Sequence, residues 1–273
     1  MKSRRRGRAF PFLLFLLPAL GSGCASLTGG GDRERVATTY EEAMELVSSS
    51  EPEDRVEALE WFGADLDPRG LETAVSALGD ESVMVRLAAV LTVREYSQPD
   101  TIRSLRPLLE DENLEVRYAA ATALFDLGDY SGLEQLVEGM KSEYPEIRHQ
   151  AMMIVAKIRS PRGIPGTIAL LGDIEPRTRS DAAYILGEIY ADPSAVPALL
   201  NSLDDQSPYV RKDAWESLKK ITGQNHPFDW QAGEDLRAAQ REVWIRWLEV
   251  NPEYGAGSAS VPPAGEEGAD GED

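Results

Sequence analysis

The residues able to carry catalysis or to bind a metal ion are few and far apart in this chain. Its two histidines, His149 and His226, stand in different contexts, and neither belongs to a His-x-x-x-His or His-Glu pair. The central region holds no Gly-x-Ser-x-Gly motif, and the chain has no phosphate-binding glycine loop. Among 47 Asp and Glu residues a catalytic carboxylate pair stays open as an alternative, but no spacing singles one out. The sequence therefore predicts no enzyme, and no catalytic, cofactor-binding or metal-binding residue.

The first 23 residues are typical of an export signal. They begin with Lys2 and four arginines, continue with the apolar run 9–20, and end in small residues. The 12 residues of that run are fewer than the ~20 that a membrane-spanning helix needs. We expect the signal to be removed, which takes away five positive charges and changes the formal charge of the chain from −19 to −24. So acidic a chain is a poor ligand for nucleic acid.

The only cysteine, Cys24, follows the signal directly. The stretch Leu20-Gly21-Ser22-Gly23-Cys24 resembles the bacterial lipobox, although Gly21 stands where leucine is more usual. This resemblance implies that Cys24 is lipidated and anchors the protein in the bacterial cell envelope. Ala25 favours the outer membrane, on its periplasmic side. The alternative is ordinary signal cleavage near Gly23, which leaves a soluble periplasmic binding module with a free thiol.

An arginine recurs through the chain at a nearly constant period, with spacings of 31, 31, 31, 31 and 32 residues. An alanine follows each arginine after three residues, and an apolar residue follows after seven. These steps place the three residues on one face of a helix, and a second apolar helix precedes each one. We predict six helical hairpins, with the extra residue of the last spacing in the loop at 191–193. The repeated positions, called anchor arginines below, are Arg55, Arg86, Arg117, Arg148, Arg179 and Arg211.

An aspartate stands six residues before four of the anchor arginines, and Ser49 and Ser142 take its place in two other repeats. From about Arg35 to Thr222 the pattern resembles the HEAT repeat, in its short bilin-lyase-like form. The resemblance implies an all-α fold, an α-solenoid (superhelix) of six hairpins, in which aspartates and arginines form a ladder between neighbouring repeats. The aspartate is also a candidate cap of the second helix. The alternative is that the arginines are solvated surface charges. The predicted ladder comprises Asp80, Arg86, Asp111, Arg117, Arg148, Asp173, Arg179, Asp205 and Arg211.

The end of a repeat array needs a cover, and residues 223–252 have the composition of one. We predict a helix from about Glu234 to Glu249 that packs Trp244 and Trp247, and this segment resembles the C-terminal part of bacterial HEAT-repeat proteins. An aromatic ligand pocket at Trp230, Trp244 and Trp247 is the alternative. The predicted organisation is a signal at 1–23, a tether at 24–32, the array at 33–222, the cap at 223–252 and a disordered acidic tail at 253–273.

The remaining candidate for function is the open face of the second helices, which lines the concave side in HEAT-like arrays. The residues two, five and nine places after each anchor arginine lie on this face. The charged residues among them are mostly acidic and a few others are apolar, which predicts an acidic groove with a few apolar side chains. A solvated face that only promotes solubility is the alternative. The candidate groove residues are Leu91, Glu95, Asp126, Met153, Tyr184 and Glu188.

These observations favour a non-catalytic scaffold or adaptor that binds a protein partner with a basic or mixed-charge segment. We expect contact with the membrane only through the lipid, no cofactor, no nucleic acid, and a monomer outside its complex. A bilin-lyase-type role stays open as an alternative, although an export signal conflicts with it.

Overall fold

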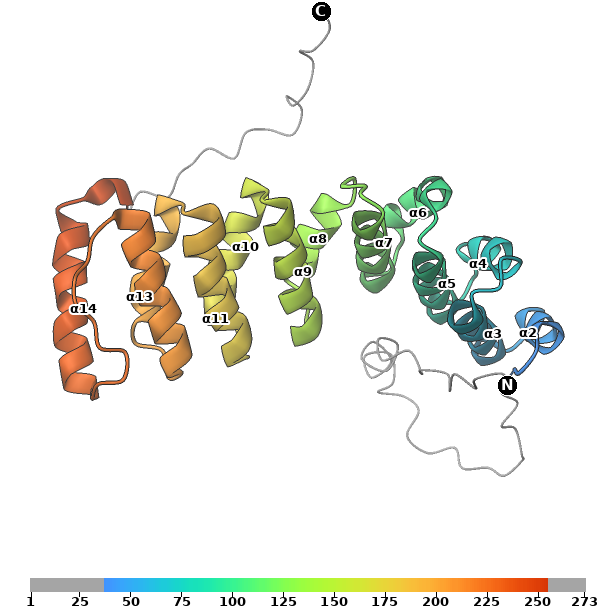
Figure 1. The fold of residues 1–273 in the computed structure, drawn as a ribbon, viewed down its shortest axis with the longest axis horizontal. Coiled ribbons are helices and arrows are strands. Elements are labelled where there is room, and N and C mark those ends of the chain that lie inside the picture. Colours follow the sequence, from blue (N-terminus) through green and yellow to red (C-terminus); the bar gives the residue numbers. More distant parts are fainter. Residues whose placement is uncertain (1–36, 255–273) are drawn as a thin grey trace, which may run out of the picture. The chain divides into compact units, whose positions relative to one another are not determined.

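The structure is a computed structural model that describes residues 37–254. All regular elements in this range are helices (Figure 1). The predicted export signal, Cys24, the tether and nearly all of the acidic tail lie outside the described residues. The fold class is therefore the predicted one, an all-α repeat fold of the α-solenoid type.

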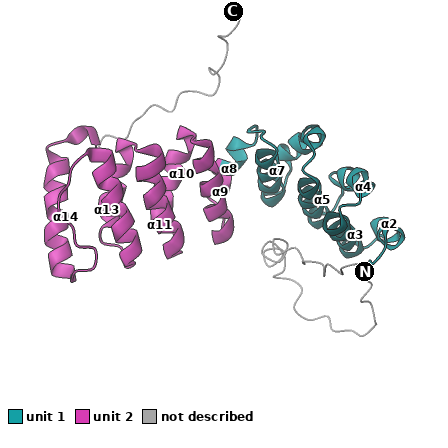
Figure 2. Ribbon diagram, viewed as in Figure 1, with its two compact units in different colours: residues 1–136 teal, residues 137–273 magenta. Residues whose placement is uncertain are grey.

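The chain divides into two compact units, residues 1–136 and 137–273 (Figure 2), with the boundary inside α8 (Leu133–Gly139). In unit 1 the described elements before α8 are α2 (Tyr40–Val47), α3 (Pro52–Asp65), α4 (Gly70–Ala77), α5 (Val83–Tyr96), η1 (Pro99–Thr101), α6 (Ile102–Leu105), η2 (Arg106–Glu110) and α7 (Leu114–Asp126). In unit 2 they are α9 (Pro145–Ile158), η3 (Pro161–Gly163), α10 (Ile164–Ala169), η4 (Leu170–Gly172), α11 (Pro176–Ile185), η5 (Leu186–Tyr190), η6 (Pro193–Ala195), α12 (Val196–Ser202), α13 (Pro208–Thr222), α14 (Glu234–Glu249) and η7 (Pro252–Tyr254).

The first helix of a hairpin is short, and in three repeats it is split into 3-10 and α segments. Proline is the local reason: Pro99, Pro161 and Pro193 each begin a 3-10 turn, and Pro107 is the second residue of η2, which follows α6. A proline has no N–H to donate and a fixed φ, so it starts a helical turn readily but interrupts a longer helix. The regular part of each hairpin is consequently its second helix.

The second helices begin and end at repeated positions. Four of them carry proline in the first turn, where a missing N–H costs least. Each helix is followed by a residue in the left-handed region, with glycine at only two of the six places. The four non-glycine residues are Leu66, Ser97, Arg159 and Ala191, with φ between 48° and 57°. Their recurrence at one register shows that hairpin geometry, more than side-chain preference, sets this conformation.

The extra residue of the 32-residue spacing lies inside a helix, and the predicted loop position is wrong. The left-handed residue follows its anchor arginine by eleven residues in the first four repeats, but Ala191 follows Arg179 by twelve. The segment between them ends in η5, a π-helix at Leu186–Tyr190. A π-helical turn accommodates one added residue without changing where the helix ends. Asp192 then caps η6, just as Ser160 caps η3 one repeat earlier.

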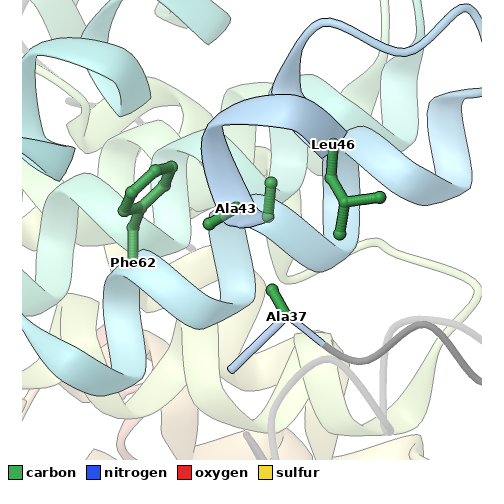
Figure 3. Packing of buried hydrophobic residues seen from close by; sticks show 5 residues of the cluster. Ala37, Ala43, Leu46 and Phe62 are labelled. Carbon is green, nitrogen blue, oxygen red and sulfur yellow. The ribbon is translucent and has the colours of Figure 1, made fainter. Parts of the chain in front are cut away.

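The core consists of the residues that the repeat predicts. The alanine three places after each anchor arginine is 0% exposed in all six repeats, and so is the apolar residue seven places after it. Figure 3 shows the core of the first hairpin, where Ala43 and Leu46 of α2 lie beside Phe62 of α3. The alanines let neighbouring helices approach closely. Complete burial of both sets of residues confirms the predicted contact face.

A cavity of about 300 Å³ lies in unit 1, next to α4. Its apolar lining includes Leu59, Ala77 and Val85, and its polar lining includes Arg55 and Asp80. Ala77 stands where the next repeat has Leu108. The smaller side chain of this lining residue leaves space that a leucine fills in the next repeat.

Candidate partner-binding surface

The anchor arginines and aspartates meet in the structure as bidentate pairs between consecutive repeats. In unit 1, Arg86 donates from Nε and Nη2 to the two carboxylate oxygens of Asp111, at 2.8 and 2.9 Å. The side chains of this pair are only 9% and 10% exposed. The other three pairs with this geometry are Arg55 with Asp80, Arg148 with Asp173, and Arg179 with Asp205.

Each anchor arginine also holds its own hairpin turn. Its Nη1 donates to the carbonyl oxygens six and five residues earlier; for Arg86 these are Asp80 and Glu81, at 3.0 and 3.2 Å. All six anchor arginines make this contact, including Arg117 to Asp111 and Glu112. In the four paired repeats one guanidinium thus joins its own turn to the aspartate of the following repeat. The arginines recur at one period because all six bind the carbonyls of their own turn.

The aspartates do not cap the second helices in the way the sequence suggests. Oδ1 of Asp80 accepts from the backbone N–H of Ser82, which is the N-cap residue itself, at 2.8 Å. Asp111, Asp173 and Asp205 do the same two residues ahead. The reason is position: the aspartate lies two residues before the cap, so it closes an Asx turn and cannot reach the first helical amides. Hydrogen bonds and the charge of Arg148 outweigh burial and lower the pKa of Asp173.

The open face of the second helices in unit 1 is acidic, but it lacks the exposed apolar side chain that the sequence predicts. Glu95 and Asp126 are exposed, whereas Leu91 is only 6% exposed and cannot serve as an apolar contact point. Leu91 lies in a run of nine buried residues, Val85–Val93, because α5 packs against both α3 and α7. A hydrogen bond of 2.9 Å from the Thr92 hydroxyl to the Leu59 carbonyl ties α5 to α3.

Unit 2 places two large side chains at one register on the second helices of consecutive repeats. Met153 of α9 is 36% exposed and Tyr184 of α11 is 52% exposed, and each stands five residues after its anchor arginine. We call these two residues the apolar patch. Contacts between neighbouring helices border it: a hydrogen bond of 2.7 Å joins Nε2 of His149 to the carboxylate of Asp181, and an ion pair joins Glu188 to Lys220. The hydroxyl of Ser180 also donates to the carboxylate of Asp213.

The charge of the predicted groove is consequently not uniform. In unit 1 its nine positions hold Glu57, Glu60, Glu95 and Asp126 and no basic residue, although Asp126 pairs with the adjoining Arg94. Burial, and then the neighbouring Glu57, raise the pKa of Glu60. In unit 2 the corresponding positions include Lys157 and Lys220 beside their acids. The face is acidic in unit 1 and of mixed charge in unit 2.

Residues 37–254 contain no group of three or more His, Cys, Asp or Glu side chains placed to hold a metal ion. None of the helices in that range has the length and apolar character that crossing a membrane requires.

At the end of the array, Trp244 packs in the core of the cap. Its side chain is 0% exposed, and its ring lies edge-on to those of His226 and Trp247, with centroids 4.9 and 6.1 Å apart. The helix that carries it, α14, has the predicted bounds. Trp230 lies in the preceding loop, and its carbonyl oxygen accepts from Nε of Arg211 at 2.9 Å. The arrangement matches the predicted packing role of the helix.

The fold and the ladder define a class of protein, the α-solenoids built from helical hairpins. Within this class, residues 41–125, 102–173 and 133–219 match the family described as HEAT repeats. These matches extend over more than half of the chain, so the chain belongs to the HEAT-repeat family. HEAT repeats generally mediate contacts between proteins.

Several solved structures are similar to the chain. The chain is similar to YibA of Escherichia coli, with 16% identity over 77% of this chain and 81% of that one, and a TM-score of 0.54. It is also similar to the complex of CpcE and CpcF of phycocyanin lyase from Nostoc sp. PCC7120, with 19% identity, coverage of 83% and 93%, and a TM-score of 0.45. An engineered protein gives 21% identity, coverage of 67% and 96%, and a TM-score of 0.47. No curated protein matches the chain.

Proposed function

We propose that this protein is a non-catalytic scaffold of the bacterial cell envelope that holds a partner protein on the open face of its second helices. The observation that carries the proposal is the apolar patch of unit 2. Met153 and Tyr184 remain exposed at the same register, although the equivalent Leu91 of unit 1 is buried. A tyrosine and a methionine are residue types enriched where proteins bind one another.

The charges around the patch indicate the chemistry of the partner. Asp181 and Glu188 are tied to His149 and Lys220, so their positions are fixed by contacts within the chain. The whole chain is strongly acidic, with a formal charge of −19. A partner segment with an apolar side chain flanked by basic residues complements the apolar patch and the negative charge of the chain. Charge attraction would accelerate the encounter, and burial of the apolar side chain would slow dissociation.

Affinity capture from envelope extracts tests this proposal. We expect the wild-type chain to retain a defined partner that Met153→Ser/Tyr184→Ser loses. The matched control, Ile174→Ser/Tyr209→Ser, removes two side chains that are 75% and 70% exposed in the same unit but off the patch. Raising the ionic strength from about 0.05 M to 0.5 M should weaken capture, because salt screens exposed charges. Equal capture by the two double variants would exclude the patch as the binding site.

The lipid anchor is proposed on the sequence around Cys24. Mass spectrometry of the N-terminal peptide of the mature protein should show an acylated cysteine as its first residue. With Cys24→Ser we expect the protein to leave the membrane fraction. An unmodified N-terminus near residue 24 in the wild type would leave the scaffold proposal standing and remove the anchor.

A further inference from the structure

The last anchor arginine differs from the others in its surroundings. Arg211 is 8% exposed, and it donates from Nε to the carbonyl of Trp230 and from Nη1 to its own turn. In four earlier repeats the Nη2 of the arginine donates to an aspartate Oδ1. Nη2 of Arg211 donates no hydrogen bond to any residue within 37–254. The last rung of the ladder therefore has a guanidinium without its carboxylate.

A second guanidinium lies at the same loop. Nη1 of Arg237, in the first turn of α14, donates to the carbonyl of Ala232 at 2.6 Å, two residues after the carbonyl that Arg211 contacts. Nε of Arg237 is buried and has no hydrogen-bond partner in the described part of the chain. Burial, and then the charge of Arg237, lower the pKa of Arg211, whereas Asp111 raises the pKa of Arg86.

The acids nearest to these two arginines do not neutralise them. Asp205 is engaged by Arg179 and by the N–H of Ser207, and neither Asp204 nor Asp205 forms an ion pair with Arg211. Glu234 and Asp235 in the first turn of α14 are exposed, and neither forms an ion pair with Arg237 among the described residues. Two guanidinium groups, one of them more than nine-tenths buried, are left with carbonyl partners only.

We propose that Arg211 and Arg237 form a carboxylate-binding site at the end of the array, which takes an acidic peptide segment. A guanidinium binds a carboxylate through two parallel hydrogen bonds, as the four paired anchor arginines do. Buried charge without a counter-charge is costly, so an incoming carboxylate gains more here than at the surface. The carboxylate comes either from a partner protein or from the acidic run at residues 266–273 of the chain.

A labelled tetraglutamate peptide, acetylated and amidated at its ends, is the probe. Its fluorescence anisotropy is followed as the full chain is added. We expect saturable binding that Arg237→Gln weakens about tenfold or more, the loss expected from a charged hydrogen bond. Arg246→Gln is the matched control: it removes the same charge from α14, but its side chain is 72% exposed and pairs with Glu242. Its effect should stay below about twofold.

A third variant distinguishes the two sources of the carboxylate. It carries E266Q, E267Q, D270N, E272Q and D273N. Tighter binding of the probe to this variant than to the wild type would assign the site to the chain's own acidic residues; equal binding would assign it to a partner. Either result supports the site. Equal weakening by Arg237→Gln and Arg246→Gln, or no saturable binding to the neutralised variant, would overturn it. None of these variants changes Met153 or Tyr184, so failure of this test leaves the proposed scaffold function unaffected.

Discussion

Replacing Arg86 by alanine is expected to lower the free energy of unfolding of unit 1 by about 3 to 5 kcal/mol. The guanidinium of Arg86 makes four short hydrogen bonds, two to Asp111 and two to the carbonyls of its own turn. Without it, Asp111 keeps a largely buried charge and the turn carbonyls lose their donor. Urea unfolding followed by circular dichroism measures the loss.

Two companion variants separate the ladder from a general effect of charge. Arg103→Ala removes an exposed arginine of α6 and should change the stability by less than about 0.5 kcal/mol. Arg86→Met/Asp111→Leu replaces the whole pair by apolar side chains and should recover most of the loss, because neither charge is then left alone. If Arg86→Ala were no more destabilising than Arg103→Ala, the arginines would be solvated surface charges.

Replacing Trp244 by alanine is expected to cost unit 2 about 3 to 5 kcal/mol. Trp244 is the largest side chain that is fully buried among the described residues, and it packs on His226, whose carbonyl oxygen accepts from Trp215 Nε1 at 3.1 Å. The cavity left behind would separate α14 from the last hairpin, and the end of a solenoid is destabilised when its cover is lost.

Val243→Ala is the control for the cap, because this residue precedes Trp244 on α14 but is 43% exposed. Its expected cost is within about 0.5 kcal/mol. Loss of the near-ultraviolet dichroism of the tryptophans should accompany Trp244→Ala. A stability equal to that of Val243→Ala would show that α14 is not a structural cap.

The second helices could be predicted from the sequence because one period governs them. An arginine, an alanine and an apolar residue recur together; the alanine and the apolar residue are fully buried in every repeat, and the arginine binds its own turn in every repeat. The bounds of α14 could be predicted for a similar reason, since an amphipathic helix with tryptophans follows a glycine. Fixed spacings are visible in one sequence when each position has a single structural task.

Other features depend on neighbours that a helical wheel does not include. Leu91 falls on the open face of an isolated helix, yet α3 and α7 bury it. The π-helix at Leu186–Tyr190 contains the extra residue that the sequence pattern places in the loop at 191–193. The approach of Arg211 and Arg237 to one loop has no periodic counterpart. The sequence nevertheless shows one sign of it, because no aspartate follows Arg211 at the ladder spacing.

Photo-crosslinking in the native envelope tests the binding role of the open face most directly. A photoreactive phenylalanine analogue placed at Tyr184, within the apolar patch, should form an adduct with a defined partner protein. The same analogue at Tyr209, which is 70% exposed in the same unit but outside the patch, should not. Met153→Ser should diminish the adduct at position 184. No adduct at position 184, or equal adducts at 184 and 209, would contradict a scaffold that binds its partner through this face.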